Sequence, residues 1–145
     1  MCMTISFNKA DANATLRNRV RLKSFIEKRV KKEGLVIESL IYVFCTDKHL
    51  LKINNDFLSH DYYTDIISFD LSEVPGRLIG EVYISVDRVK DNAKTLGVSY
   101  KEELHRVIFH GALHFCGYKD KKPSDANLMR SMEDKWLKAY LNLIS

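Results

Sequence analysis

The chain has 145 residues, of which 46% are hydrophobic, 29% charged and 10% aromatic, and its net charge is +4. This balance excludes a mainly disordered chain and predicts one globular domain spanning residues 1–145. No apolar run approaches about 18 residues, so no segment is expected to span a membrane. The first residues lack the apolar stretch of a secretory signal, which makes the cytoplasm the expected location. The weak positive charge favours anionic partners without identifying one.

The predicted elements follow from the spacing of apolar residues and from capping and turn residues. In chain order they are a strand at 5–7, a helix at 15–33, a strand at 35–44, a helix from 46 or 47 to 57, strands at 66–69 and 78–86, and helices at 87–96, 99–116 and 123–141.

Capping residues mark where several of these helices begin. Thr46 or Asp47 is expected to cap the helix that ends near residue 57, and Asp87 the next helix. Ser99 and Glu102 have the spacing of a capping box. The strands at 66–69 and 78–86 resemble a hairpin, which argues against a purely βαβ winding. We therefore predict an α+β fold with a mixed sheet of three to four strands packed with four to five helices.

A possible metal site lies near the end of the helix at 99–116. His110 and His114 are four residues apart, so they share one helix face and lie one turn apart. Gly117 allows a sharp exit from the helix, and Asp120 can then return as an oxygen ligand. Two imidazoles, one carboxylate and an open position are typical of catalytic zinc. We expect one zinc ion per chain; the alternative is two surface histidines and a solvated aspartate.

The neighbouring residues favour an open site rather than a closed one. His105 and Cys116 point about 140° away from His110, so we expect them to be packed side chains. Together with Cys2 and Cys45, Cys116 makes three widely spaced cysteines, which predicts reduced thiols.

The position directly after His110 carries no acidic group. Zinc peptidases of the His-Glu-x-x-His type have their general base there, whereas this chain has Gly111. A peptidase is therefore disfavoured, the catalytic base is unassigned, and metal-bound water is the expected nucleophile. A glycine inside a helix costs about 1 kcal/mol relative to alanine, so we expect substrate or a neighbouring element to approach closely at Gly111.

Three segments resemble the YbeY family of bacterial ribosomal RNA maturation factors. Residues 110–118 resemble the family's histidine signature, residues 61–69 its segment ending in a Ser-Phe strand, and residues 80–85 its Gly-Asp/Glu-Ile-x-Ile strand. The resemblance implies a zincin-like fold and a zinc-dependent endoribonuclease that selects single-stranded RNA. It also implies a role in 16S ribosomal RNA 3′-end maturation and ribosome quality control, with ribosomal RNA or the small subunit as partner.

Two positions depart from the family pattern. The family usually has a histidine as third ligand, where this chain has Asp120. A carboxylate also binds zinc, but it lowers the net charge of the centre and should make bound water less acidic. The family commonly has an arginine where Leu58 stands, so that residue's phosphate contact does not carry over. His60 is a possible substitute, and a plain loop histidine is the alternative.

Candidate RNA contacts lie on the helix predicted at 15–33. Arg17, Arg21 and Lys28 share one face at helical spacing, although a solvated face would look the same. Tyr62 and Tyr63 are suited to stacking on unpaired bases or to packing in a turn.

A second possible function is a non-catalytic ribosome-assembly factor whose zinc is structural. The sequence does not predict the oligomeric state.

Overall fold

The computed structural model describes residues 4–60 and 63–145. Its elements, in chain order, are β1 (Thr4–Lys9), α1 (Arg19–Lys32), β2 (Val36–Cys45), α2 (Asp47–Leu58), β3 (Ile66–Asp70), β4 (Arg77–Ser85), α3 (Val86–Leu96), α4 (Tyr100–Phe115) and α5 (Pro123–Ile144).

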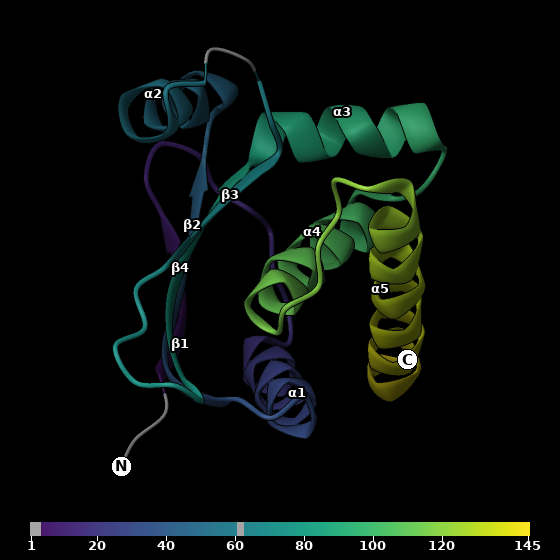
Figure 1. Cartoon of the computed structure of the whole chain (residues 1–145). Coiled ribbons are helices and arrows are strands. Elements are labelled where there is room, and N and C mark those ends of the chain that lie inside the picture. The colour runs from purple at the N-terminus through teal and green to yellow at the C-terminus, as the bar shows by residue number, and fades with distance from the viewer. Residues whose placement is uncertain (1–3, 61–62) are drawn as a thin grey trace.

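The four strands form one mixed sheet in the order β1-β2-β4-β3 (Figure 1). Strand β2 is central and runs parallel to both β1 and β4. Strand β3 pairs antiparallel with β4, with Ser68 opposite Val82, as expected of the predicted hairpin. The mixed sheet and the five helices confirm the α+β prediction.

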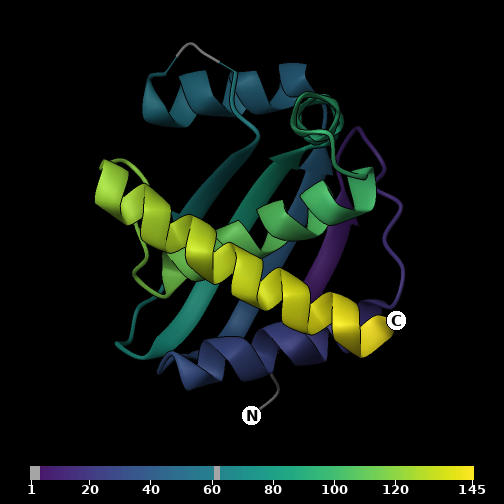
Figure 2. The ribbon, with the colours of Figure 1, turned by 90° about the vertical axis from the view of Figure 1, so that its right-hand side faces the viewer.

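The helices cover the two faces of the sheet unequally. Helices α1 and α4 lie against one face, and α5 packs across α4 as an outer layer (Figures 1 and 2). Helix α2 lies on the opposite face, near one end of the sheet. Helix α4 is therefore held between the sheet and α5, so its side chains have fixed directions.

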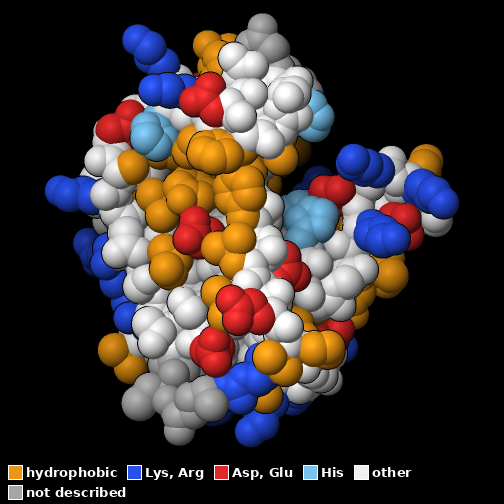
Figure 3. All heavy atoms as spheres, turned by 60° about the vertical axis from the view of Figure 1, so that its left-hand side comes forward, with side chains coloured by type: hydrophobic (Ala, Val, Ile, Leu, Met, Phe, Trp, Pro, Cys, Tyr) orange, Lys and Arg blue, Asp and Glu red, His pale blue; other side chains and the backbone are white. Residues whose placement is uncertain are grey.

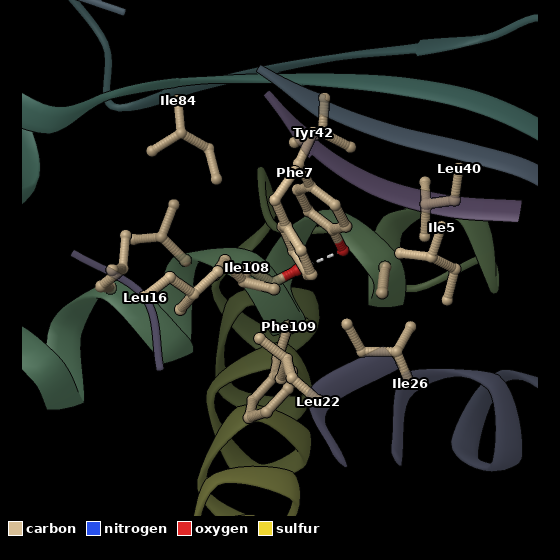
Figure 4. Close-up of a cluster of buried hydrophobic side chains, with 14 of the residues drawn as sticks. Ile5, Phe7, Leu16, Leu22, Ile26, Leu40, Tyr42, Ile84, Ile108 and Phe109 are labelled. Atoms are coloured by element: carbon tan, nitrogen blue, oxygen red, sulfur yellow. Dashed lines mark hydrogen bonds between the residues drawn. The ribbon is translucent and has the colours of Figure 1, made fainter. Parts of the chain in front are cut away.

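The main core lies between the sheet and α4 (Figure 4). Strand side chains such as Phe7 and Leu40 meet helix side chains such as Ile26 and Phe109 there. The Tyr42 hydroxyl, fully buried on β2, donates a 2.9 Å hydrogen bond to the carbonyl of Ile108 on α4. Burial raises the pKa of Tyr42, so the phenol stays protonated. This bond ties α4 to the sheet two residues before His110.

The first helix begins later than predicted. It starts at Arg19, because Asn18 adopts a left-handed conformation with φ of 57° and interrupts a helix that would have begun at residue 15. Leu16 is buried although it precedes the helix, and Val20 is 83% exposed. The apolar spacing therefore predicted one helix where the structure has a connector followed by a shorter helix. Arg17 lies in the connector, so it does not share a helical face with Arg21 and Lys28.

Two further boundaries differ from the prediction. Ser85, not Asp87, caps α3: its hydroxyl accepts a 3.1 Å hydrogen bond from the backbone N–H of Arg88. The strand therefore ends at Ser85, and Asp87 lies in the first turn, where an acidic side chain favours the helix dipole. Helix α5 runs to Ile144. The caps Thr46 and Ser99 are confirmed, since each accepts a bond from a backbone N–H.

The cysteine prediction holds for the described residues. Cys45 and Cys116 are free thiols, and burial raises the pKa of each to about 12. Cys2 lies outside the described residues. Within residues 4–60 and 63–145, no helix has the length and apolar character needed to cross a membrane.

Candidate metal centre

Helix α4 carries the two histidines on the face that points away from the core. Ser99 caps its first turn, and the helix ends where Cys116 and Gly117 leave the helical path, Gly117 with φ of 98°. The chain then turns back, so that Asp120 returns to the helix face. The left-handed glycine thus makes the predicted return possible.

His110, His114 and Asp120 converge on one point. Their potential ligand atoms all lie within 4.8 Å of one another. The Oδ2 atom of Asp120 lies 3.1 Å from Nε2 of His110 and 3.2 Å from Nε2 of His114. A tetrahedral zinc ion with bonds of about 2.0–2.2 Å separates its ligand atoms by roughly 3.3–3.6 Å. The three side chains therefore need only a small adjustment to hold such an ion.

A carboxylate on α5 fixes the orientation of the first histidine. Nδ1 of His110 lies 2.6 Å from Oε2 of Glu133, which is 6% exposed. The other oxygen of Glu133 accepts a 3.2 Å bond from Arg106, and Arg106 also pairs with Asp134 at 2.7 Å. The chain Arg106–Glu133–His110 holds the ring so that Nε2 faces Asp120. Such a carboxylate–histidine pair is a common support of metal sites.

The hydrogen bond to Glu133 also sets the protonation of His110. Burial opposes the charged imidazolium, but the hydrogen bond and the charge of Glu133, with smaller contributions from Asp120 and Asp65, outweigh it and raise the pKa of His110. When the ring is neutral, its proton belongs on Nδ1, where Glu133 accepts it. The Nε2 lone pair is then available to a metal ion.

The three side chains line a cleft of about 650 Å³. Its lining comes from α2 and the segment after it, from β3, and from α3, α4 and α5, and it includes Leu58, His60, Thr64, Lys121 and Arg130. Figure 3 shows a hollow on this side of the molecule, with histidine inside it and Lys and Arg side chains on one of its walls. Lys121 and Arg130 can contact the phosphates of a polyanion, beside the acidic residues that also line the cleft.

Three more acidic residues line the cleft: Asp65, Asp70 and Glu103. Burial raises the pKa of Asp65, against the opposing effect of the charge on His110. Burial likewise raises the pKa of Glu103, helped by the charge of Asp65. Glu103 is 5% exposed, and its Oε1 atom has no hydrogen-bond partner among the described residues. Carboxyl groups with raised pKa values in a cleft are typical of functional sites.

The structure explains the glycine that follows His110. A Cβ atom at Gly111 would lie 3.1 Å from Cδ1 of Ile66 and 3.1 Å from Cγ1 of Val82. This confirms the expected close approach and identifies the sheet as the approaching element. A side chain at position 111 would point into the sheet, away from the metal centre.

Gly111→Glu is therefore expected to destabilise the fold without supplying a catalytic base. Overpacking costs about 1–3 kcal/mol, and a buried carboxyl group without a partner adds about 1–3 kcal/mol. Urea unfolding checks this, with Lys101→Glu, exposed on the same helix, as a control with a change near zero. A Gly111→Glu protein as stable as wild type would show that α4 can move away from the sheet.

The remaining predicted site residues lie elsewhere. His105 packs in the core with its ring 5.3 Å from that of Tyr140, and burial lowers its pKa. It is not among the residues that converge with His110, in agreement with the prediction. Arg21 and Lys28 are exposed on α1, and Arg17 is exposed before it. None of the described residues that line the cleft comes from α1.

Of the two tyrosines predicted to stack on bases or to pack in a turn, the structure describes only Tyr63. Tyr62 lies outside the described residues. Tyr63 is 57% exposed, and the Arg88 guanidinium lies 5.7 Å from the centre of its ring.

Sequence reasoning missed Glu133, Arg106 and Asp65. A signal for Glu133 was present, because its helical spacing places it on the same face as Met129, Trp136 and Tyr140, which are all buried. A charged residue on an otherwise apolar helix face needs a partner. That partner, Arg106, lies 27 residues earlier in the chain. No local pattern identifies Asp65, whose place depends on how β3 crosses α4.

Comparison with known proteins places these features in one family. Residues 4–141 match the family model described as Endoribonuclease YbeY. A protein of that name from Cytophaga hutchinsonii is 50% identical over 131 residues, covering 90% of this chain and 92% of the relative. Another, from Flavobacterium johnsoniae, is 51% identical over 114 residues, covering 79% and 78%.

A solved structure shares the fold. The solution structure of TM1509 from Thermotoga maritima superposes with a TM-score of 0.66 at 23% identity, covering 96% of this chain and 90% of that one. At this level of identity the likeness supports the architecture alone. It agrees with the mixed sheet and five helices described above.

Proposed function

This chain belongs to the Endoribonuclease YbeY family, and from that premise we propose that it is a zinc-dependent endoribonuclease that cleaves single-stranded RNA. The observation that carries the proposal is the convergence of His110, His114 and Asp120 in an open cleft. The substrate we propose is the 3′ region of 16S ribosomal RNA within the small subunit, in the cytoplasm, during maturation and ribosome quality control.

The donor set suits zinc. Two imidazole nitrogens and one carboxylate oxygen are typical ligands of catalytic zinc, and they leave one position for solvent or substrate. When bound, such an ion lowers the pKa of coordinated water and stabilises charge on phosphate oxygens. This chain holds the three ligands in place, and Glu133 orients the first of them.

The cleft also suits a single strand of RNA. Its volume of about 650 Å³ is in the range of pockets for small ligands, so it can take a short stretch of one strand rather than a duplex. Lys121 and Arg130 line it and supply positive charge for phosphates. Arg17, Arg21 and Lys28 would then contact RNA outside the cleft. Leu58 is 41% exposed at the cleft wall, so an apolar contact replaces the family's arginine there.

The test joins metal analysis to a ribonuclease assay. Wild-type protein should bind one zinc ion per chain and cleave a single-stranded RNA, and chelation should stop cleavage until zinc is restored. Asp120→Ala should lose both properties. Cleavage that continues in fully chelated protein would overturn the proposal. Zinc binding without any cleavage would favour the alternative, a ribosome-assembly factor with structural zinc.

A further inference from the structure

Position 111 of α4 does not supply the carboxylate that zinc sites of the His-Glu-x-x-His type have directly after the first histidine. The position after His110 points into the sheet, where Ile66 and Val82 leave no room for a side chain. A base that removes the proton from the attacking water must therefore come from another position that lines the cleft.

Asp65 occupies such a position. It directly precedes β3, and the next residue, Ile66, packs on Gly111, one residue from His110. Its backbone oxygen accepts a 2.9 Å bond from the N–H of Ser85, which fixes the chain where it enters the cleft. Its carboxylate receives a long 3.4 Å bond from Asn92 of α3 and lines the same cleft as the three ligands.

The surroundings of Asp65 fit a group that exchanges protons. The charged groups that act on its carboxyl come from three other parts of the chain: His110 on α4, Asp120 in the following loop and Glu133 on α5. The carboxyl also acts on Glu103. It lines the same cleft as the residues of the metal centre, but it is not one of the three that converge on a single point.

The other acidic residues of the cleft are less suited to the task. Both oxygens of Glu133 are occupied, one by His110 and one by Arg106. Glu103 lies seven residues before His110 on α4, which places it about 10 Å away along the helix axis. Asp70 lies at the far end of β3 and accepts a 3.0 Å bond from the N–H of Ser72. Asp65 lines the cleft together with the three ligands, and its charge interacts with His110, Asp120 and Glu133.

We propose that Asp65 is the catalytic base of this enzyme, an inference that rests on the proposed endoribonuclease function. The water oxygen attacks phosphorus while the Asp65 carboxylate accepts the proton that the water loses. The bond from phosphorus to the departing ribose oxygen breaks, and that oxygen keeps the electron pair and takes up a proton. The proton on Asp65 passes to the departing oxygen or to solvent, so each cleavage consumes one water.

Asp65→Asn tests this assignment. The variant should bind zinc and single-stranded RNA as wild type does, while kcat falls by about 100-fold or more, the usual contribution of a general base. Asp91→Asn is the matched control, because Asp91 is an exposed aspartate of α3 next to Asn92 and pairs with Arg88 outside the cleft. It should keep the wild-type kcat.

Asp65→Ala with added formate separates a catalytic role from a structural one. Formate should restore part of the lost kcat, because a small carboxylate can take the vacant place; it should not stimulate wild type. The assignment is overturned if Asp65→Asn keeps its kcat, if it loses zinc together with activity, or if formate has no effect. Wild-type protein that does not cleave RNA at all would instead refute the proposed function.

Discussion

His114→Ala is expected to abolish zinc binding and RNA cleavage together. The substitution removes one of three converging ligands, so zinc affinity should fall by more than the roughly 10–100-fold that changes outside the ligand sphere cause. The fold should persist, because His114 is partly exposed near the end of α4 and its side chain contacts the exposed Asp120. Competition with a chromophoric chelator measures the affinity, and a fluorogenic RNA measures cleavage.

His49→Ala provides the control for this variant. His49 lies on α2 and outside the cleft, so the same change in side chain should leave zinc binding and cleavage intact. Thermal unfolding of both variants checks that each is folded. A His114→Ala protein that retains stoichiometric zinc and full activity would refute the ligand assignment.

Glu133→Gln is expected to weaken zinc binding by about 10–100-fold, the usual effect of losing a carboxylate that supports a ligating histidine. Glutamine has nearly the same shape but no negative charge, so it makes the His110 imidazole a poorer donor. The substitution also removes the negative charge of the ion pair between Glu133 and Arg106. Chelator competition at neutral pH measures the change.

Asp134→Asn is the matched control for Glu133→Gln. Asp134 is the next residue on α5 and also pairs with Arg106, but its side chain is 58% exposed. An exposed ion pair contributes little, so this variant should bind zinc almost as tightly as wild type. Equal zinc affinity in the two variants would show that the contact between Glu133 and His110 does not support metal binding.

The parts of the fold that depend on local pattern were predictable. Strand β2 is a long apolar and β-branched run, and the caps at Thr46 and Ser99 follow from residue type alone. The start of α1 was not predictable in this way. Leu16 continues the apolar spacing but belongs to a connector, and the interruption at Asn18 depends on a backbone conformation that the pattern does not reveal.

The residues of the site likewise fall into those that local sequence pattern predicts and those that it does not. His110, His114 and Asp120 lie within eleven residues, so helical spacing and one glycine turn were enough to bring them together. Glu133 contacts His110 from α5, and Asp65 lines the cleft from the residue before β3, both through packing between distant segments. Their roles depend on tertiary contacts, which a single sequence does not contain.

The aspartate at position 120 has a consequence for the metal centre. Where the family's pattern usually has a neutral histidine, this chain has a carboxylate whose Oδ2 atom lies 3.1 and 3.2 Å from the two Nε2 atoms. A metal ion held by this set would form a centre of lower net charge, which would reduce the acidity of coordinated water. A base beside the centre, as inferred for Asp65, compensates for a less acidic water.

X-ray absorption at the zinc edge of the loaded wild-type protein tests the central claim most directly. The account predicts four-coordinate zinc with two imidazole nitrogens at about 2.0–2.1 Å and two oxygens at about 2.0–2.2 Å, one from Asp120 and one from solvent. A sulfur atom at about 2.3 Å, or a third imidazole, would mean that a fourth protein ligand closes the site. That result would contradict an open, catalytic centre.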